Sequence, residues 1–361
     1  MIRSTLVSLI LTVLLCFSAE VFTVQAQAIS NPEGEPERLT PEDFLPKTMH
    51  GSQFSEFWNF QFYFDNGMKA HIIFSLANFS RMQVTGVRVS IFGLDNKKVY
   101  QLSREYPIED FKITRDTFML ELNPRQKNVW FGGDLSDEFN IYINTAKDGE
   151  RFNIELNITD IVQGFQMGDG KYQVHDESIG LLTHIPFAKV TGRVGINDNI
   201  KDVSGTAYMD HTYQNQTTTT LMHSGYRFVY HKDKNNWDVM YYMQPKNQMG
   251  KQTVGYRISS SNGRPNATSV VGIINSIDGK AFKDNLPESM TLYFENQETA
   301  TITRTIDEEK HSILGNLSWL ARQAARAFIG GDIKDYRGTA TLEAQQGKII
   351  KKGEYNYFVV D

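Results

Sequence analysis

Three residues at the end of one predicted strand carry the side chains best suited to chemistry in this chain. Tyr208, Asp210 and His211 stand together in the run Tyr-Met-Asp-His. Because side chains alternate along a strand, Tyr208 and Asp210 share one face, whereas His211 points to the other. A carboxylic acid beside a phenol can protonate or orient a bound substrate. We therefore predict Asp210, Tyr208 and His211 as candidate catalytic residues.

Each of these residues also has a purely structural interpretation. Asp210 could accept backbone hydrogen bonds or form an ion pair with Arg193 or Arg227. Tyr208 could be a cross-strand packing residue, and His211 a packed histidine. Burial raises the pKa of a carboxyl group and a paired arginine lowers it. A proton donor at this position therefore requires Tyr208 and Asp210 to face one mainly apolar cavity, with Asp210 buried and free of a bidentate arginine.

The segments around these residues are predicted to be β-strands. Two series of short aromatic and β-branched runs, separated by Gly, Asn and Asp turns, span residues 54–158 and 225–360. Such spacing is typical of barrels or sandwiches. One helix is predicted over residues 312–329, where apolar residues recur at helical spacing. The predicted fold class is therefore all-β, with two antiparallel barrel-like domains and one helix in the C-terminal region.

Residues 1–28 have the features of a secretory signal. A positively charged start precedes an apolar run, and Ala26-Gln27-Ala28 forms a small-residue cleavage site. We therefore predict that residues 1–28 are removed and that the protein is periplasmic or secreted. The alternative is a lipoprotein anchored through Cys16, although Leu15 stands where lipoproteins carry a small residue.

Length and composition predict that the rest of the chain consists of a linker and two domains. A length of 361 residues favours two domains. Residues 29–47 contain much Pro and Glu and few apolar side chains, which predicts an extended linker. The two strand series then predict an N-terminal domain over residues 48–215 and a C-terminal domain over residues 216–361.

Several function classes are disfavoured by the sequence. A net charge of -5 argues against nucleic-acid binding, which needs clustered positive charge. The histidines do not fall into metal-ligand spacings, so we expect no metal site. The chain has no glycine-rich phosphate loop, no dinucleotide fingerprint and no Gly-x-Ser-x-Gly turn, so we expect no cofactor.

The run from residue 184 to residue 216 resembles the end of the N-terminal domain in the hydroxyneurosporene synthase/AttH-like family. That family includes bacterial carotenoid hydratases and is similar to fungal survival-factor and Diels–Alderase lipocalin-like proteins. The matching positions are Pro186, Val190, Thr191, Gly192, Gly205, Tyr208, Asp210, His211 and Tyr213. Weaker matches lie at residues 57–60 with 66–67 and at residues 224–228 with 237–238. Tyr213 stands where the family usually has Trp.

The resemblance implies two lipocalin-like, calycin-type β-barrel domains with a cavity for a hydrophobic ligand near their interface. An aromatic strand such as that of Trp58 and Phe60 is usually core, but it can also line such a cavity. The candidate ligand-binding residues are Trp58, Phe60, His184, Tyr213, Tyr226 and Arg227.

Two functions stay open at this point, beside a purely structural protein with a filled barrel. The first is an exported protein that binds a lipid or isoprenoid. The second is a carotenoid-hydratase-like enzyme that hydrates or cyclises an isoprenoid alkene, with Asp210 as general acid and Tyr208 facing the cation. The predicted helix over residues 312–329 either packs on the second barrel or contacts a membrane surface.

Overall fold

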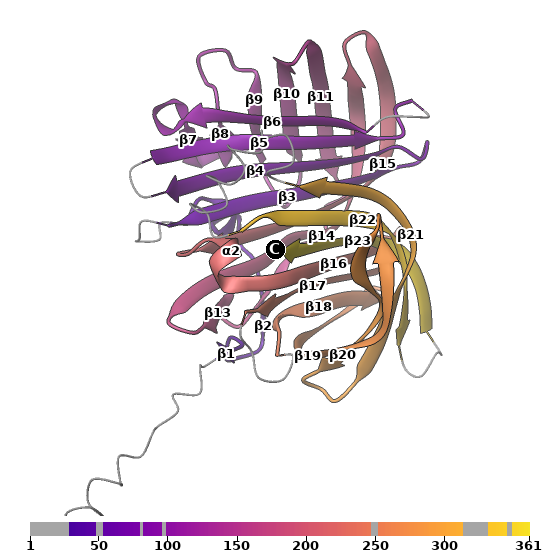
Figure 1. The fold of residues 1–361 in the computed structure, drawn as a ribbon. Helices are drawn as coiled ribbons and strands as arrows, with labels where there is room; N and C mark the ends of the chain where they lie inside the picture. Colours follow the sequence, from indigo (N-terminus) through magenta and orange to yellow (C-terminus); the bar gives the residue numbers. More distant parts are fainter. Residues whose placement is uncertain are drawn as a thin grey trace, which may run out of the picture.

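Two antiparallel β structures meet at one interface in this protein (Figure 1). The computed structural model describes residues 29–47, 53–79, 82–95, 99–246, 252–312, 331–344 and 349–361. The N-terminal structure is a curled sheet, and the C-terminal structure is a closed barrel of eight strands. The all-β prediction is confirmed. The first domain is a curled half-barrel, whose sheet path ends at two edges.

The N-terminal sheet is built around two long central strands, β14 and β15. Its strand order is β6 (Tyr100–Pro107), β5 (Met82–Phe92), β4 (Lys69–Phe79), β3 (Ser55–Phe64), β15 (Asn199–Gln214), β14 (Glu177–Ile196), β11 (Glu150–Thr159), β10 (Phe139–Lys147), β9 (Val129–Gly133), β8 (Met119–Glu121) and β7 (Lys112–Thr114). Two 3-10 turns, η2 (Ile108–Asp110) and η3 (Arg115–Thr117), lie between β6 and β8. Four short strands, β1 (Ile29–Ser30), β2 (Pro36–Arg38), β12 (Phe165–Met167) and β13 (Lys171–Val174), extend the sheet beside β14.

The C-terminal barrel follows the chain order. A four-residue helix, α2 (Thr218–Leu221), connects β15 to its first strand. The strands are β16 (Met222–Asp233), β17 (Asn236–Pro245), β18 (Val254–Ser261), β19 (Arg264–Ala281), β20 (Asp284–Phe294), β21 (Thr299–Ser312), β22 (Ile333–Ala344) and β23 (Ile349–Val360). Pairing between β16 and β23 closes the barrel. Aromatic side chains pack its interior, where Tyr226 stacks between Tyr242 and Tyr355.

Two sequence predictions fall on residues that the structure does not describe. The predicted signal peptide covers residues 1–28, and nearly all of the predicted helix at 312–329 lies within 313–330, outside the described residues. In the described part of the chain, no helix has both the length and the apolar character needed to cross a membrane.

Residues 29–47, predicted to be an extended linker, instead pack against the N-terminal sheet. Strand β1 (Ile29–Ser30) pairs with β13, and β2 (Pro36–Arg38) pairs with β12. The 3-10 helix η1 (Pro41–Phe44) then buries Phe44 completely against Phe131 and Phe139. The polar composition of this segment predicted a linker. Its few apolar residues, Leu39 and Phe44 among them, are nevertheless buried, and they hold the segment against the sheet.

Side chains alternate between the two faces of strand β3, and each face lies in a different environment. Trp58, Phe60 and Phe62 on one face lie in the core of the N-terminal sheet. Asn59 on the other face donates a hydrogen bond to Asp210, whose carboxylate also meets a barrel residue. The neighbouring strand β15 follows the same rule, so one face of each strand is core and the other is domain interface.

The interface is held by apolar packing and by polar contacts between the domains. Tyr208 and Phe187 of the sheet share a hydrophobic cluster with Trp237 and other barrel residues. Lys69 pairs with Glu354 of β23 at 2.6 Å. Apolar and ionic contacts thus link the two domains.

His231 of the barrel forms one such contact with a defined protonation state. Its Nε2 lies 2.8 Å from the carbonyl oxygen of Pro186, so this nitrogen carries the proton and donates. Its Nδ1 lies 3.0 Å from the Thr206 hydroxyl and accepts. Burial lowers the pKa of His231 to about 4, because the charged imidazolium is poorly solvated there.

The lowered pKa of His231 predicts a pH-dependent contribution to stability. Between pH 6.5 and 4 the unfolded chain protonates this histidine and the folded chain does not, so the free energy of unfolding falls as the pH falls. His231→Gln removes this contribution, which amounts to at most about 1.4 kcal/mol per pH unit. Urea unfolding across this range should show a flatter pH dependence for the variant. Equal slopes would contradict the assignment.

The packing of η1 predicts a large cost for truncating its buried aromatic side chain. Phe44→Ala should lower the free energy of unfolding by about 3–5 kcal/mol, because the cavity cannot fully collapse. Phe282 is 44% exposed and provides the control, since Phe282→Ala should change stability by no more than about 0.5 kcal/mol. Urea denaturation of both variants tests whether residues 29–47 belong to the folded core or form a linker.

Candidate functional site

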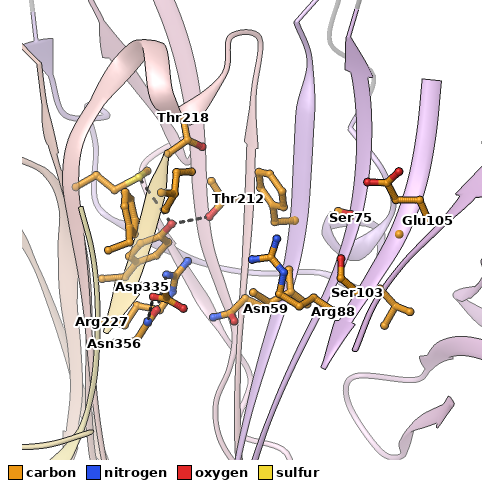
Figure 2. Close-up of a pocket in the computed structure, with 18 of the residues that line it drawn as sticks. Asn59, Ser75, Arg88, Ser103, Glu105, Thr212, Thr218, Arg227, Asp335 and Asn356 are labelled. Atoms are coloured by element: carbon orange, nitrogen blue, oxygen red, sulfur yellow. Dashed lines mark hydrogen bonds between the residues drawn. The ribbon is translucent and has the colours of Figure 1, made fainter. Parts of the chain in front are cut away.

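A cavity of about 200 Å³ lies between the N-terminal sheet and the C-terminal barrel (Figure 2). Side chains from both domains line it, so neither domain forms it alone. Its walls are apolar at Phe57, Val87 and Phe358 and polar at Arg88 and Arg227. A concave site that combines apolar walls with a few convergent polar groups is the usual form of a small-molecule site.

Two cross-strand rows of the N-terminal sheet form one wall. The first row runs across β15, β3, β4, β5 and β6 as Asp210, Asn59, Ile73, Arg88 and Ser103, of which all but Asp210 line the cavity. The second row runs across the same strands as Thr212, Phe57, Ser75, Gly86 and Glu105. Directly paired residues of antiparallel strands project from the same face, which explains how positions distant in sequence meet in one cavity.

The barrel supplies the opposite wall through its outer face. Arg227 of β16 is paired in register with Tyr241 of β17 and with Asn356 of β23. The neighbouring Gly225 lies beneath the ring of Phe358, and a Cβ on this glycine would stand 2.3 Å from that ring. The absence of a side chain at residue 225 therefore lets Phe358 lie flat and form part of the cavity wall.

Asp210 and Arg227 form a bidentate ion pair across the domain interface. The Nε of Arg227 lies 2.6 Å from Oδ2 of Asp210, and its Nη2 lies 3.0 Å from Oδ1. Asn59 donates a third hydrogen bond to Oδ2 at 2.8 Å. Asp210 has no exposed surface, and Arg227 is only 9% exposed. Of the two arrangements left open by the sequence, the structure therefore has the ion pair with Arg227 and not the unpaired carboxyl that a proton donor requires.

This geometry makes Asp210 an acceptor of hydrogen bonds. Two of its bonds come from a guanidinium and the third from an amide N–H, and all three require lone pairs on its oxygens. None of the three bonds uses Asp210 as a donor. Asp210 thus acts as the counter-ion that holds Arg227, and Arg193, the other sequence-based candidate, pairs with Glu155.

Arg227 is the member of the pair that reaches the cavity. Its guanidinium lies 3.9 Å from the centre of the Tyr241 ring, and its Nη1 donates to Asn356 at 3.2 Å. Burial opposes its charge, but the attraction of Asp210 prevails and the pKa of Arg227 stands above its ordinary value. Burial also raises the pKa of Tyr241 to about 12, so its hydroxyl, 2.9 Å from that of Thr212, stays protonated at neutral pH.

A polar chain continues from Arg227 along the interface. Asn356 donates to Asp335, and Asp335 is paired with Arg337 at 2.7 Å. Arg337 contacts Glu309 at 3.2 Å, and Gln101 of the N-terminal sheet donates to Glu309 at 2.7 Å. Asp335, which also lines the cavity, is therefore already engaged by two barrel side chains.

Arg88 is the exception among the charged residues of the cavity. In Figure 2 its side chain extends from the N-terminal sheet toward the barrel wall, where Arg227 and Asp335 lie. Within the described part of the chain, Arg88 has no hydrogen-bond or ion-pair partner. Burial lowers the pKa of Arg88, and the nearby charge of Asp335 only partly offsets the effect. A partly buried guanidinium without a direct partner is costly, which makes Arg88 the cavity residue with unused hydrogen-bond donors.

Tyr208 and His211 lie outside this cavity, on opposite faces of β15. Tyr208 is fully buried in the interfacial hydrophobic cluster. Burial raises the pKa of Tyr208 well above its usual value, with a smaller contribution from Asp210. His211 points into the N-terminal sheet, where it stacks on Trp58 at 4.8 Å. The structure therefore does not bring these two residues and Asp210 to one cavity.

The predicted ligand-binding residues are likewise dispersed, and Arg227 alone among them lines the interface cavity. Trp58 and Phe60 are core residues of the N-terminal sheet, and Tyr226 lies inside the barrel. Tyr213 packs its ring against Gly180, where a Cβ would stand 2.0 Å from ring atoms. The remaining residue of this set, His184, lies beside His211.

Sequence reasoning missed Arg88, Asn59 and Asn356 as cavity residues. Each lies in a strand between apolar neighbours, and a polar residue on the inward face of a predicted strand was the available signal. Their meeting depends on strand register, which a single sequence does not specify. Among the described residues, no group of three or more His, Cys, Asp or Glu side chains is placed to hold a metal ion.

The Asp210–Arg227 pair predicts an asymmetric response to mutation. Asp210→Ala should lower the free energy of unfolding by about 3–5 kcal/mol, because it leaves the Arg227 charge buried and unpaired. Glu155→Ala breaks the pair with Arg193, whose two side chains are 60% and 58% exposed, and should cost no more than about 1 kcal/mol. Chemical denaturation measures both values, and similar losses would show that Arg227 does not depend on Asp210.

Comparison with solved structures finds the same fold in other proteins. An AttH-like protein from Nitrosomonas europaea aligns with a TM-score of 0.61 at 14% identity, over 89% of this chain and 97% of that chain. Kievitone hydratase from Nectria haematococca aligns with a TM-score of 0.52 at 11% identity, over 85% and 88% of the two chains. CghA, solved with Sch210972, aligns with a TM-score of 0.58 at 9% identity, over 86% and 89%.

No protein-family model and no curated protein matches the sequence. At identities this low the structural likeness defines the fold and does not transfer an activity. The resemblance found in the strand ending at Asp210 and His211 is confirmed at that level: this chain has the lipocalin-like fold shared by AttH-like proteins, kievitone hydratase and CghA.

Proposed function

We propose that this protein binds a hydrophobic small molecule, of the lipid or isoprenoid class, in the cavity between its two domains. The observation that carries the proposal is the pairing of apolar walls with the unpartnered guanidinium of Arg88. Apolar walls supply affinity by removing ligand surface from water. A single convergent polar group supplies orientation.

The polar end of this ligand is an oxygen acid, such as a carboxylate or an enolate. A guanidinium offers N–H groups in a fixed fork that matches two oxygens. Arg227 already uses two of its nitrogens on Asp210 and a third on Asn356, so it adds mainly positive charge. Arg88 retains its donors for the ligand. Because Asp335 is engaged by Asn356 and Arg337, it competes weakly for Arg88.

The size of the cavity limits how much of a ligand is enclosed. A cavity of about 150 Å³ holds one benzene ring, and this one measures about 200 Å³. A ten-carbon isoprenoid is of suitable size, whereas a full carotenoid would place only one end inside. Ser103, Arg104 and Glu105 are exposed and line the same cavity, so they mark where a longer ligand would emerge.

An enzymatic role is the second candidate, favoured by the kievitone hydratase and CghA folds. In such a role Asp210 is not the general acid, because its oxygens are occupied by Arg227 and Asn59. The available chemistry is stabilisation of negative charge on a substrate oxygen by Arg88 and Arg227.

We further propose that the protein is exported, on the basis of the signal-like residues 1–28.

The identity of the ligand can be tested on protein purified under native conditions. Organic extraction followed by mass spectrometry should release an apolar molecule with an acidic group. Calorimetric titration with the matched isoprenoids geranic acid and geraniol should show at least tenfold tighter binding of the acid. Arg88→Met should abolish this difference, whereas Arg193→Met, on an exposed arginine paired with Glu155, should preserve it.

Two results would count against the proposal at different levels. Failure of both isoprenoids to bind, with no extracted molecule, would reject the binding function. Equal affinity for the acid and the alcohol would reject Arg88 as the anion anchor and leave the apolar cavity as the binding element.

A further inference from the structure

The outer face of strands β9, β10 and β11, which are labelled at the top of Figure 1, carries a pair of stacked aromatic rings. Trp130 and Tyr142 stand directly opposite each other in the register of β9 and β10. Their ring centres lie 5.8 Å apart and their planes differ by 21°, which is the offset stacking that aromatic pairs prefer. The neighbouring residues Phe131, Ile141 and Ile143 lie in the core of the N-terminal sheet. Side chains alternate along a strand, so both rings are held on the solvent side, where they are half-buried.

Two ion pairs lie beside the rings, one on each side of the aromatic pair. On the β11 side, Glu155 pairs with Arg193 of β14 at 2.5 Å. On the β8 side, Glu121 pairs with Lys112 of β7 at 3.2 Å. Both acidic residues follow the rings in the cross-strand register. The charges nearest the rings therefore cancel each other.

Amide side chains flank the rings along the strand direction. Asn140 and Asn144 lie two residues before and two residues after Tyr142 on β10, and they are paired with Asn157 and Asn153 of β11. Alternation places these four amides on the same outer face as the rings. Because asparagine is shorter than tyrosine or tryptophan, the two rings project above a floor of amides.

Several polar atoms around the rings are unused and open to solvent. Asn144 accepts a hydrogen bond from Arg151 at 2.9 Å, which leaves the donors of its Nδ2 free. Asn157 donates to Glu138 at 2.7 Å and to Asn140 at 3.1 Å, which leaves its Oδ1 free. In the described part of the chain, these two atoms and the indole N–H and phenol hydroxyl of the rings have no partner, and none of them is buried. A ligand on this face can therefore reach each of them.

The spacing of these groups favours an extended ligand. Asn140 and Asn144 lie on opposite sides of the aromatic row, four residues apart, and this length of strand corresponds to about 14 Å. A short, extended chain of linked pyranose rings covers such a distance. The face is turned away from the core of a curled sheet and encloses no compact molecule, so affinity has to come from contacts spread along its length.

We propose that this outer face binds a neutral saccharide, an extended chain of β-linked pyranose rings that lies along β10. One face of such a sugar ring presents C–H groups, which pack against an aromatic ring, while its equatorial hydroxyl groups point sideways. Hydroxyl groups both donate and accept, so they match the free donors of Asn144 and the free acceptor of Asn157. The cancelled charges beside the rings favour a neutral ligand. A stable protein partner would bury a larger apolar area than two rings supply.

This saccharide site is separate from the interface cavity. Among the described residues, none that lines the cavity belongs to β9, β10 or β11. The proposal therefore does not depend on Arg88 or on the hydrophobic ligand proposed above, and each can fail without the other.

Cellotetraose and maltotetraose form a matched pair of probes, because both are glucose tetramers and only the linkage differs. The β-linked chain is extended, whereas the α-linked chain curls. Calorimetric titration should show cellotetraose binding about tenfold tighter or more. Trp130→Ala should weaken cellotetraose binding by about tenfold or more, as removal of a central aromatic contact does. Tyr293→Ala is the matched control, since it removes a ring that is 40% exposed on the barrel, and it should leave binding unchanged.

Two further variants keep the test decisive if Trp130→Ala does not fold. Asn144→Ala and Asn157→Ala retain both rings and each remove one free amide group. Each should weaken cellotetraose binding by about threefold or more, the loss of one neutral hydrogen bond. Both positions are half-buried on the surface of the sheet, where such substitutions change stability little. Arg88→Met should leave cellotetraose binding unchanged, since it alters only the interface cavity.

The possible results separate clearly. Cellotetraose binding that depends on Trp130, Asn144 and Asn157, and is unaffected by Tyr293→Ala and Arg88→Met, would establish the site. Absence of cellotetraose binding to the wild-type protein would overturn the proposal. Equal affinity for the two tetrasaccharides, or full affinity in a folded Trp130→Ala variant or in both asparagine variants, would overturn it as well.

Discussion

The buried ion pair between Asp210 and Arg227 is the constraint on which the rest of the structure depends. One partner belongs to the N-terminal sheet and the other to the barrel, and neither charge could stay buried without the other. The pair therefore fixes the distance and orientation of the two domains at one point. The pair also places the guanidinium of Arg227 in the wall of the interface cavity, where it is bound to Asp210. Among the described residues, the arginine of this cavity without a direct partner is Arg88.

The interface cavity follows from this fixed arrangement and from sheet geometry. Cross-strand rows bring Asn59, Ile73 and Arg88 into line on one wall, and the outer face of the barrel supplies the other. Lipocalin-like proteins can hold a ligand inside a barrel, but here aromatic rings such as Tyr226 pack the barrel interior. In this protein the cavity instead lies between the two domains, where the outer face of the filled barrel forms one wall.

The sequence predicted the class of the fold and the alternation of faces, because both depend on local patterns. The opposite orientations of Asp210 and His211 followed from the period of two along a strand. The partner of Asp210 could not be derived in the same way. Arg193 and Arg227 were equal candidates, and only register and domain packing decide between them. Residues 29–47 were misjudged because few of their side chains carry the packing, which composition does not reveal.

The two faces of strand β15 carry two different sets of polar contacts. Asp210 and Thr212 face the barrel, while His211 faces the buried Glu56 and His184. Since the side-chain period of a strand is two, inserting or deleting one residue ahead of position 208 would exchange these faces. The carboxylate would enter the aromatic core and the imidazole would meet a guanidinium. Substitutions can alter the residues on either face independently, whereas a change of length by one residue would exchange the two faces unless a β-bulge absorbed it.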